Sequence, residues 1–148
     1  MADEPIAYRF SGIQIISKSL APMPETSPDS LGYSFSILLE MKVDEKLKMV
    51  SPVVYIKIFY GEIESRLELA SFTVAYYFEL PEFEKVMVKT DENAYIIPNE
   101  LDALMKPIAI STTRGIIYSE LRGTYLQSVL LPVVIMDKFD YGDPPGFR

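Results

Sequence analysis

Residues 33–43 read Tyr-Ser-Phe-Ser-Ile-Leu-Leu-Glu-Met-Lys-Val and alternate between apolar and polar side chains, with only Leu38 out of phase. A period of two places successive side chains on opposite faces of an extended strand. In antiparallel sheets one face commonly packs on a core while the other meets water. The stretch therefore predicts an antiparallel strand with one buried face.

Three further runs flank this segment and are predicted as strands. They are residues 10–20, 53–60 and 66–80. Three prolines and a closing glycine in residues 21–32 predict a long crossing loop after the first strand, and the charged residues 44–48 predict a turn. The apolar phase of the last run changes near Ala70, which predicts a β-bulge.

Helical spacing appears only in the last third of the chain. Apolar residues at 101, 104, 105 and 108 recur at i, i+3, i+4 and i+7 after Asn99, a good N-cap. Pro107 interrupts this pattern, which predicts that a short helix ends there and that a main helix begins. The main helix is expected to run to Arg122, with Gly123 in the left-handed C′ position.

Strands followed by helices predict an α+β fold, with a four-stranded antiparallel sheet on which the main helix and the short preceding helix pack. Residues 1–148 fit one domain. Residues 82–95 are expected to form a loop, with a short strand as an alternative at 86–88. Residues 130–136 are expected to be extended, and the Gly- and Pro-containing tail from about residue 138 is expected to be flexible.

The residues that are absent restrict the chemistry. The chain has no Cys and no His, which removes thiolate nucleophiles, the imidazole base and the usual zinc ligands. We therefore expect no metal and no cofactor. The acidic pairs at 44/45, 62/64 and 91/92 lie in predicted turns, where solvated side chains are the rule. A carboxylate-based enzyme is the least favoured alternative.

Charge and hydropathy limit the partners and the location. The net charge is −7 and no Lys/Arg cluster stands out, so we expect no nucleic-acid partner. No apolar run approaches the roughly 20 residues that a membrane helix needs, so we expect no membrane insertion. The first residues, Met-Ala-Asp-Glu-Pro, lack the features of a secretory signal, and a cytoplasmic location is expected.

Packing in a hydrophobic core does not by itself explain two features of the sequence. Tyr76 and Tyr77 are neighbours on a predicted strand and must face opposite sides of the sheet. The second face is therefore either covered by a helix or a subunit, or it offers aromatic surface to a ligand. Arg114 falls on the apolar stripe of the predicted helix, where either a position at the stripe's edge or an ion pair beneath the helix is open.

The stretch Arg-Gly-Thr-Tyr-Leu-Gln at residues 122–127, followed by Leu130, Pro132 and Val133, resembles the helix-end signature of the SecB export chaperones. Pro107 and Arg114 resemble landmarks of the main helix in that family, with an interval that differs by about a residue. The resemblance implies a SecB-like fold in a cytosolic homotetramer, a dimer of dimers. It also implies that non-native polypeptide binds in long apolar grooves.

The sequence departs from the family pattern after Val133. Classical members carry a second amphipathic helix there, whereas residues 134–141 lead here into Gly and Pro. This departure puts contact with an export motor in doubt. It is shared with the SecB-like relatives of toxin-antitoxin systems, which protect an antitoxin.

The resulting hypothesis is a SecB-like holdase without enzymatic activity, whose clients are non-native polypeptides. A dedicated chaperone with an antitoxin-like partner is the first alternative. The expected client contacts are aromatic and aliphatic residues beside the sheet and the main helix. They are Tyr76, Phe78, Leu80, Phe83, Tyr118, Leu121, Tyr125 and Leu126.

Overall fold

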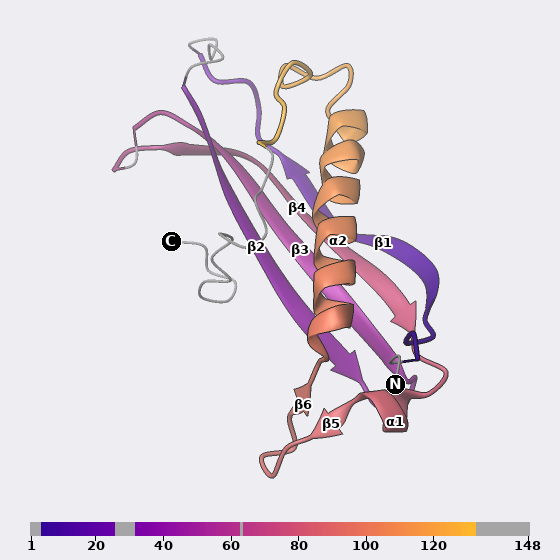
Figure 1. The fold of residues 1–148 in the computed structure, drawn as a ribbon. Helices are drawn as coiled ribbons and strands as arrows, with labels where there is room; N and C mark the ends of the chain where they lie inside the picture. Colours follow the sequence, from indigo (N-terminus) through magenta and orange to yellow (C-terminus); the bar gives the residue numbers. More distant parts are fainter. Residues whose placement is uncertain (1–3, 26–31, 63, 133–148) are drawn as a thin grey trace.

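The computed structural model describes residues 4–25, 32–62 and 64–132 as an α+β domain, which confirms the predicted fold class (Figure 1). Four antiparallel strands form a sheet of order β1-β4-β3-β2, and a two-stranded hairpin stands beside it. The elements are β1 (Arg9–Leu20), β2 (Tyr33–Asp44), β3 (Met49–Tyr60), β4 (Leu67–Glu79), α1 (Phe83–Val86), β5 (Val88–Lys89), β6 (Tyr95–Ile96) and α2 (Asn99–Glu120).

The strand β2 has the two-faced character that its sequence predicts. In its register with β3, Ile37 lies opposite Ile56 and Leu39 lies opposite Val54. These side chains belong to the hydrophobic core or pack against it on the side of the sheet that α2 covers. Residues directly opposite each other share a face, so the apolar set of β2 continues across β3.

Strand β3 begins at Met49, earlier than the sequence predicted. Pro52 therefore lies inside the strand rather than before it. Pro52 is paired opposite Met41 of β2. On the other side, the register with β4 passes from Val50–Phe78 directly to Val53–Ala75. A proline has no N–H to donate, and it occupies a place where the ladder to β4 is interrupted.

The predicted bulge near Ala70 is confirmed. Ile58 of β3 lies opposite Ala70 of β4, whereas the next residue, Phe59, lies opposite Glu68. Leu69 is therefore the extra residue of β4, and both Leu69 and Ala70 are buried. This insertion explains the change of apolar phase along the strand.

The helix break predicted at Pro107 does not occur, because α2 is one continuous helix of 22 residues with Pro107 inside it. Pro107 is exposed, so its ring does not disturb the buried side of α2. The helix has Pro98 as its N-cap residue, which makes Asn99 the first helical residue rather than the cap. Gly123 adopts the expected left-handed conformation, with φ of 79°, but it lies two residues after the C-cap Leu121.

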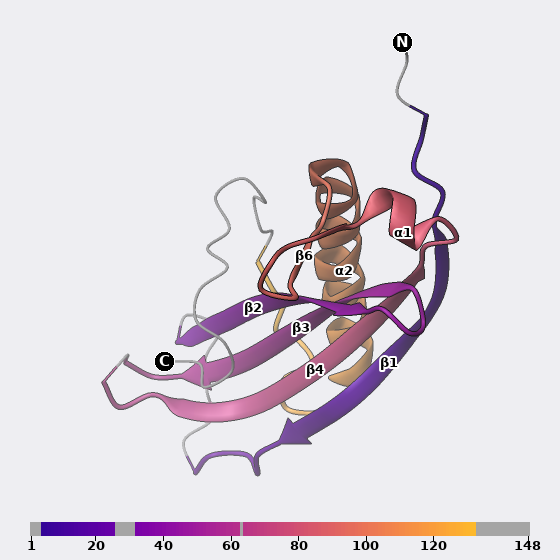
Figure 2. The same ribbon diagram turned by 90° about the horizontal axis from the view of Figure 1, so that it is seen from below.

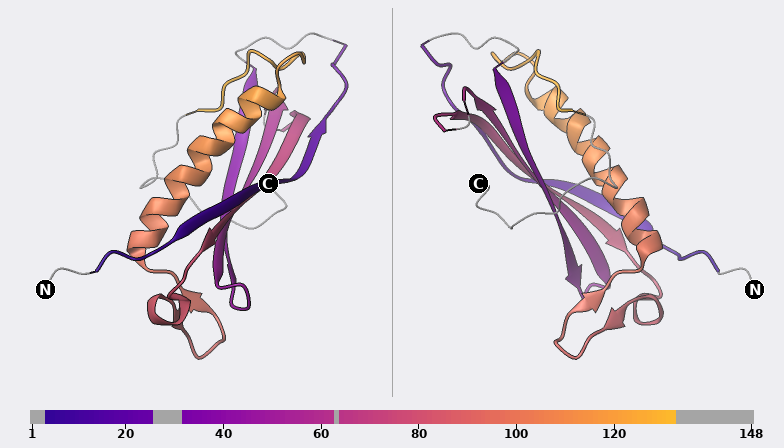
Figure 3. Two further views of the ribbon diagram at one scale, coloured as in Figure 1. Left: turned by 90° about the vertical axis from the view of Figure 1, so that its right-hand side faces the viewer. Right: turned by 60° about the vertical axis from the view of Figure 1, so that its left-hand side comes forward.

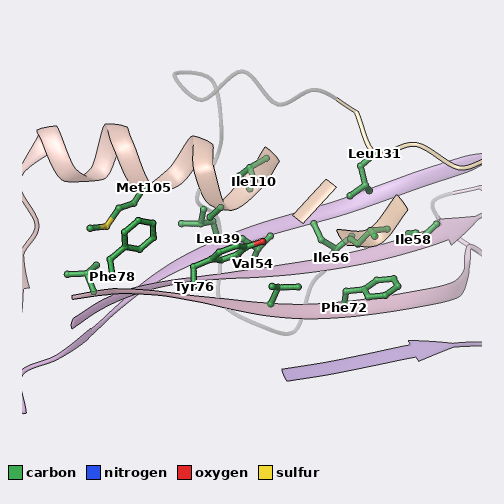
Figure 4. Close-up of a cluster of buried hydrophobic side chains, with 14 of the residues drawn as sticks. Leu39, Val54, Ile56, Ile58, Phe72, Tyr76, Phe78, Met105, Ile110 and Leu131 are labelled. Carbon is green, nitrogen blue, oxygen red and sulfur yellow. The ribbon is translucent and has the colours of Figure 1, made fainter. Parts of the chain in front are cut away.

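The core lies between the sheet and α2, which packs against β3 and β4. Figure 4 shows Tyr76, Phe78, Met105 and Ile110 among the side chains that fill this layer. Residues 121–132, here called the post-helix segment, turn back over the same side of the sheet (Figure 3). Several of their side chains are buried, namely those of Leu121, Leu126, Val129 and Leu131.

The loop predicted for residues 82–95 is only partly correct. This region forms α1 and the β5–β6 hairpin, and Phe83 of α1 is buried with its ring 5.4 Å from that of Tyr95. Residues 130–132 carry neither helix nor strand. The extended segment expected at residues 130–136 lies mostly outside the described residues, and the tail expected to be flexible from about residue 138 lies wholly outside them.

Candidate binding surface

The outer face of the sheet, which α2 does not cover, carries polar groups that bond to one another. Tyr77 donates its hydroxyl to Oε1 of Gln14 at 2.6 Å, and Tyr55 donates to Oε2 of Glu40 at 2.9 Å. Burial, together with Glu40, raises the pKa of Tyr55 to about 12. The tyrosines of this face are therefore partners in a polar layer rather than an apolar platform.

The inner face holds Tyr76 in the core, which settles how Tyr76 and Tyr77 are divided between the two faces. The Tyr76 hydroxyl lies 2.6 Å from Oγ1 of Thr113 on α2. Thr113 donates its own proton to the carbonyl of Ala109 at 2.7 Å, so Tyr76 is the donor to Thr113. Burial raises the pKa of Tyr76 to about 12.

Most of the side chains expected to contact a client are core residues in the folded chain. Six of them are at most 2% exposed, and these are Tyr76, Phe78, Leu80, Phe83, Leu121 and Leu126. Tyr118 is 51% exposed and Tyr125 is half-buried. Client contact by these eight residues stays a prediction, and Tyr118 and Tyr125 are the two that offer appreciable surface.

The largest run of exposed apolar side chains lies on β1. Phe10, Ile13, Ile15 and Leu20, here called the β1 stripe, are each 36 to 44% exposed. They lie opposite Phe78, Tyr76, Val74 and Ala70 of β4, so they point to the same side of the sheet as α2. The helix packs over β3 and β4, and β1 curves along the margin of the sheet (Figure 2). The stripe is therefore left open.

Sequence reasoning placed Ile13 and Ile15 on one side of a strand but did not identify the stripe as surface. Burial of a strand depends on its neighbours, and the sequence alone does not reveal that β1 is at an edge of the sheet. Edge strands with exposed apolar side chains are sites for pairing with another chain. This property makes β1 the first candidate for a binding surface.

A pocket of about 270 Å³ lies where β1 ends beside the end of α2. It is lined by Lys18, Ser19, Leu20, Phe72, Glu120 and Leu121. Nζ of Lys18 is 2.8 Å from Oε2 of Glu120, so an ion pair joins the strand to the helix at this pocket. Leu20 belongs both to the pocket and to the β1 stripe, which makes the two features continuous.

Two hydrogen bonds fix the post-helix segment beside this surface. Tyr125 donates its hydroxyl to the carbonyl of Ala21 at 2.8 Å, which ties the segment to the end of β1. Arg114 donates from Nε to the carbonyl of Leu131 at 3.2 Å. This hydrogen bond from Arg114 to the backbone was not expected from the sequence. The two alternatives there were a position at the edge of the apolar stripe and an ion pair beneath the helix.

The described residues show no arrangement typical of a catalytic or metal site. Within them, no group of three or more acidic side chains could hold a metal ion. The acidic pairs at 44/45, 62/64 and 91/92 are exposed, as expected of solvated turns. No helix among them is long and apolar enough to span a membrane.

The four-stranded antiparallel sheet with a main helix on one face is an architecture similar to that of a solved SecB-like chaperone. The chain is similar to the Mycobacterium tuberculosis Rv1957 SecB-like chaperone, solved in complex with a ChAD peptide from the Rv1956 HigA1 antitoxin. The TM-score is 0.56 over 86% of this chain and 90% of that chain, at 14% identity, which shows a common fold. No protein-family model and no curated protein sequence matches the chain.

Proposed function

We propose that this chain is a SecB-like holdase that binds non-native polypeptides without breaking or making a covalent bond and without a cofactor. The observation that carries the proposal is the β1 stripe, an open apolar surface on an edge strand, together with the pocket at its end. The SecB-like fold supports the same conclusion. The proposal includes a cytoplasmic location.

Hydrophobic burial supplies enough energy for transient capture on such a surface. At roughly 25 cal/mol per Å² of apolar area, a contact of a few hundred Å² gives several kcal/mol before the cost of ordering the client. An extended client can also pair with the free backbone edge of β1. Binding of this strength is reversible without an energy source, so release needs no nucleotide.

Suppression of aggregation tests the proposal. We expect the chain to delay aggregation of a chemically denatured reporter enzyme. We expect the double variant Ile13→Ser and Ile15→Ser to lose most of this effect, because it removes apolar surface from the β1 stripe. The matched control is Gln14→Ala with Ser17→Ala, on the opposite face of the same strand. A wild-type chain that never delays aggregation would contradict the proposal.

A second candidate is a dedicated partner chaperone of a toxin-antitoxin system. It is favoured by the similarity to Rv1957, which was solved with an antitoxin peptide. Co-purification from the native cells distinguishes the two candidates. One dominant partner at fixed stoichiometry favours the dedicated role, and a mixture of partners favours the general holdase. The sequence after residue 132, on which contact with an export motor depends, lies outside the described residues.

A further inference from the structure

We propose that residues 82–96, here called the flap, open as a separate unit and that exposed ion pairs latch the flap to the rest of the domain. The flap comprises α1, β5 and β6, which lie beyond the end of the sheet (Figure 1). Ionic strength then controls how much apolar surface the chain exposes. The use of that surface for client binding rests on the proposed function, whereas the opening itself does not.

Two prolines separate the flap from the regular elements on either side of it. Pro81 comes two residues after the end of β4, and Pro98 is the N-cap residue of α2. A proline has no N–H to donate, so neither the ladder of β4 nor the hydrogen bonds of α2 continue into the flap. In the described part of the chain, backbone hydrogen bonds of the flap join its own residues, apart from the bond of the Phe83 N–H to the carbonyl of Leu80. The flap can therefore open while the sheet and α2 stay intact.

Two ion pairs join the flap to the turn between β2 and β3. Nζ of Lys48 in the turn lies 3.1 Å from Oε1 of Glu84 in α1. Nζ of Lys89 in β5 lies 3.7 Å from Oε2 of Glu45 in the turn. Desolvation and a hydrogen bond to Glu45 raise the pKa of Tyr95 in β6, so this carboxylate faces both strands of the hairpin. The four charged side chains are 47 to 69% exposed, so dissolved salt screens their attraction.

The flap carries buried apolar side chains that its opening would bring into solvent. Phe83 is 1% exposed and Met87 is 5% exposed, and the ring of Phe83 lies 5.4 Å from that of Tyr95. Their burial supplies most of the attraction that keeps the flap closed, and the ion pairs add a smaller part that salt removes. Lys85 of α1 also lies 3.7 Å from Glu4, shortly before β1. The newly exposed surface would therefore appear near the start of β1.

Amide hydrogen exchange at two salt concentrations tests the latch. The backbone amides of Met87 and Thr90 donate to carbonyls of other flap residues, so both report opening of the flap. We expect exchange at these two amides to be roughly three- to tenfold faster in about 0.5 M sodium chloride than in about 0.02 M. Exchange at Val54 and Val74, which lie opposite each other in the sheet, should stay unchanged.

A double variant removes the charge of the latch and nearly preserves its shape. In Glu45→Gln with Glu84→Gln, we expect the two flap amides to exchange rapidly already at low salt, with no further effect of salt. The matched control is Glu68→Gln, which breaks the exposed ion pair of Glu68 with Lys57 on the sheet and should behave as the wild-type chain. Wild-type exchange in the flap that does not respond to salt overturns the proposal. Salt dependence that survives in the double variant also overturns it, as does equal acceleration at Val54 and Val74.

A dye that fluoresces on apolar surface measures the consequence of opening. We expect the double variant to bind more dye at low salt than the wild-type chain and Glu68→Gln do. If its flap opens without added dye binding, Phe83 and Met87 stay covered and the proposal is wrong. If the flap behaves as expected but the chain never delays aggregation, the flap stands and the holdase function is wrong. If the chain delays aggregation while flap exchange ignores salt, the flap is wrong and the holdase function stands.

Discussion

Tyr76 of β4 and Thr113 of α2 share a buried hydrogen bond of 2.6 Å that joins the sheet to its helix. The two hydroxyl groups differ in the other hydrogen bonds that they make. Thr113 also donates to the carbonyl of Ala109, whereas the Tyr76 hydroxyl has Thr113 as its described partner. The two residues therefore differ in what remains unsatisfied when the other is replaced.

We expect Thr113→Val to destabilise the chain more than Tyr76→Phe. Thr113→Val leaves the Tyr76 hydroxyl buried without an acceptor and costs about 1–3 kcal/mol. Tyr76→Phe leaves Thr113 bonded to Ala109 and costs about 1 kcal/mol. Urea unfolding of both variants measures the two free energies. A larger loss in Tyr76→Phe would show that the Thr113 hydroxyl depends on Tyr76 instead.

Stability is expected to fall at high pH. The pKa of Tyr76 is raised by burial to about 12, above the ordinary value of 10.0. A raised pKa means that folding favours the protonated hydroxyl, so this stabilisation is complete below pH 10 and is lost as the pH rises through about 12. Tyr55 titrates in the same window. Unfolding free energies across this range should fall less steeply in Tyr55→Phe and in Tyr76→Phe than in the wild-type chain.

Replacing Pro107 by alanine is expected to stabilise the chain. Pro107 lies inside α2 and is exposed, so alanine restores a helix hydrogen bond without disturbing the core. Proline in a helix interior destabilises the folded chain by about 3 kcal/mol relative to alanine. The substitution also gives the unfolded chain more conformational freedom, which reduces the gain in stability by about 0.4–1 kcal/mol. We expect a net gain of about 2 kcal/mol in thermal or urea unfolding. Pro22→Ala, in the loop after β1, should give no such gain.

Arg114→Met is expected to loosen the post-helix segment. The substitution keeps the aliphatic stem but removes the bond from Nε to the carbonyl of Leu131, with an expected loss of about 1–2 kcal/mol. Amide hydrogen exchange should accelerate first at Val129 and Leu131. Arg122→Met, at an exposed position beyond the helix, is the control and should leave exchange unchanged. Equal acceleration throughout the sheet would show that Arg114 acts on the whole domain rather than on the segment.

The homotetramer that the sequence resemblance implies gives a prediction for the mass of the native assembly. Strand β2 is the other edge strand of the sheet and can pair with a second copy, which leaves the β1 stripe to the client. We expect native mass spectrometry to record a tetramer that persists in the double variant Ile13→Ser and Ile15→Ser. A chain that remains monomeric at micromolar concentration would contradict this assembly.

The sequence was sufficient for features that depend on local periodicity. The alternation of residues 33–43 predicted β2, and the change of phase near Ala70 predicted the bulge at Leu69. It was insufficient where tertiary neighbours decide. Pro107 suggested a break because local rules do not reveal that its ring faces solvent. Tyr76 and Phe78 were predicted as client contacts from their aromatic character, whereas their burial in the core depends on α2.

The open surface of β1 was missed for a related reason. Its apolar pattern is that of an ordinary core strand, and only the strand order makes it an edge. The pocket was missed because Lys18 and Glu120 are 102 residues apart in the chain. Leu121 was selected from the sequence and does line the pocket, although no local signal connected it with Lys18.

The strand order also determines when β1 can find its place during synthesis. Arg9 pairs with Glu79 and Leu20 pairs with Ala70, so β1 is translated first but its partner β4 follows 50 to 70 residues later. At about 5–20 residues per second, this delay is roughly 3 to 14 seconds. Strands β2, β3 and β4 are joined by short turns, so each can pair with the preceding strand soon after it is synthesised. The nascent chain therefore carries an unpaired apolar strand for several seconds, and during this interval the protein is itself the kind of polypeptide that a holdase protects.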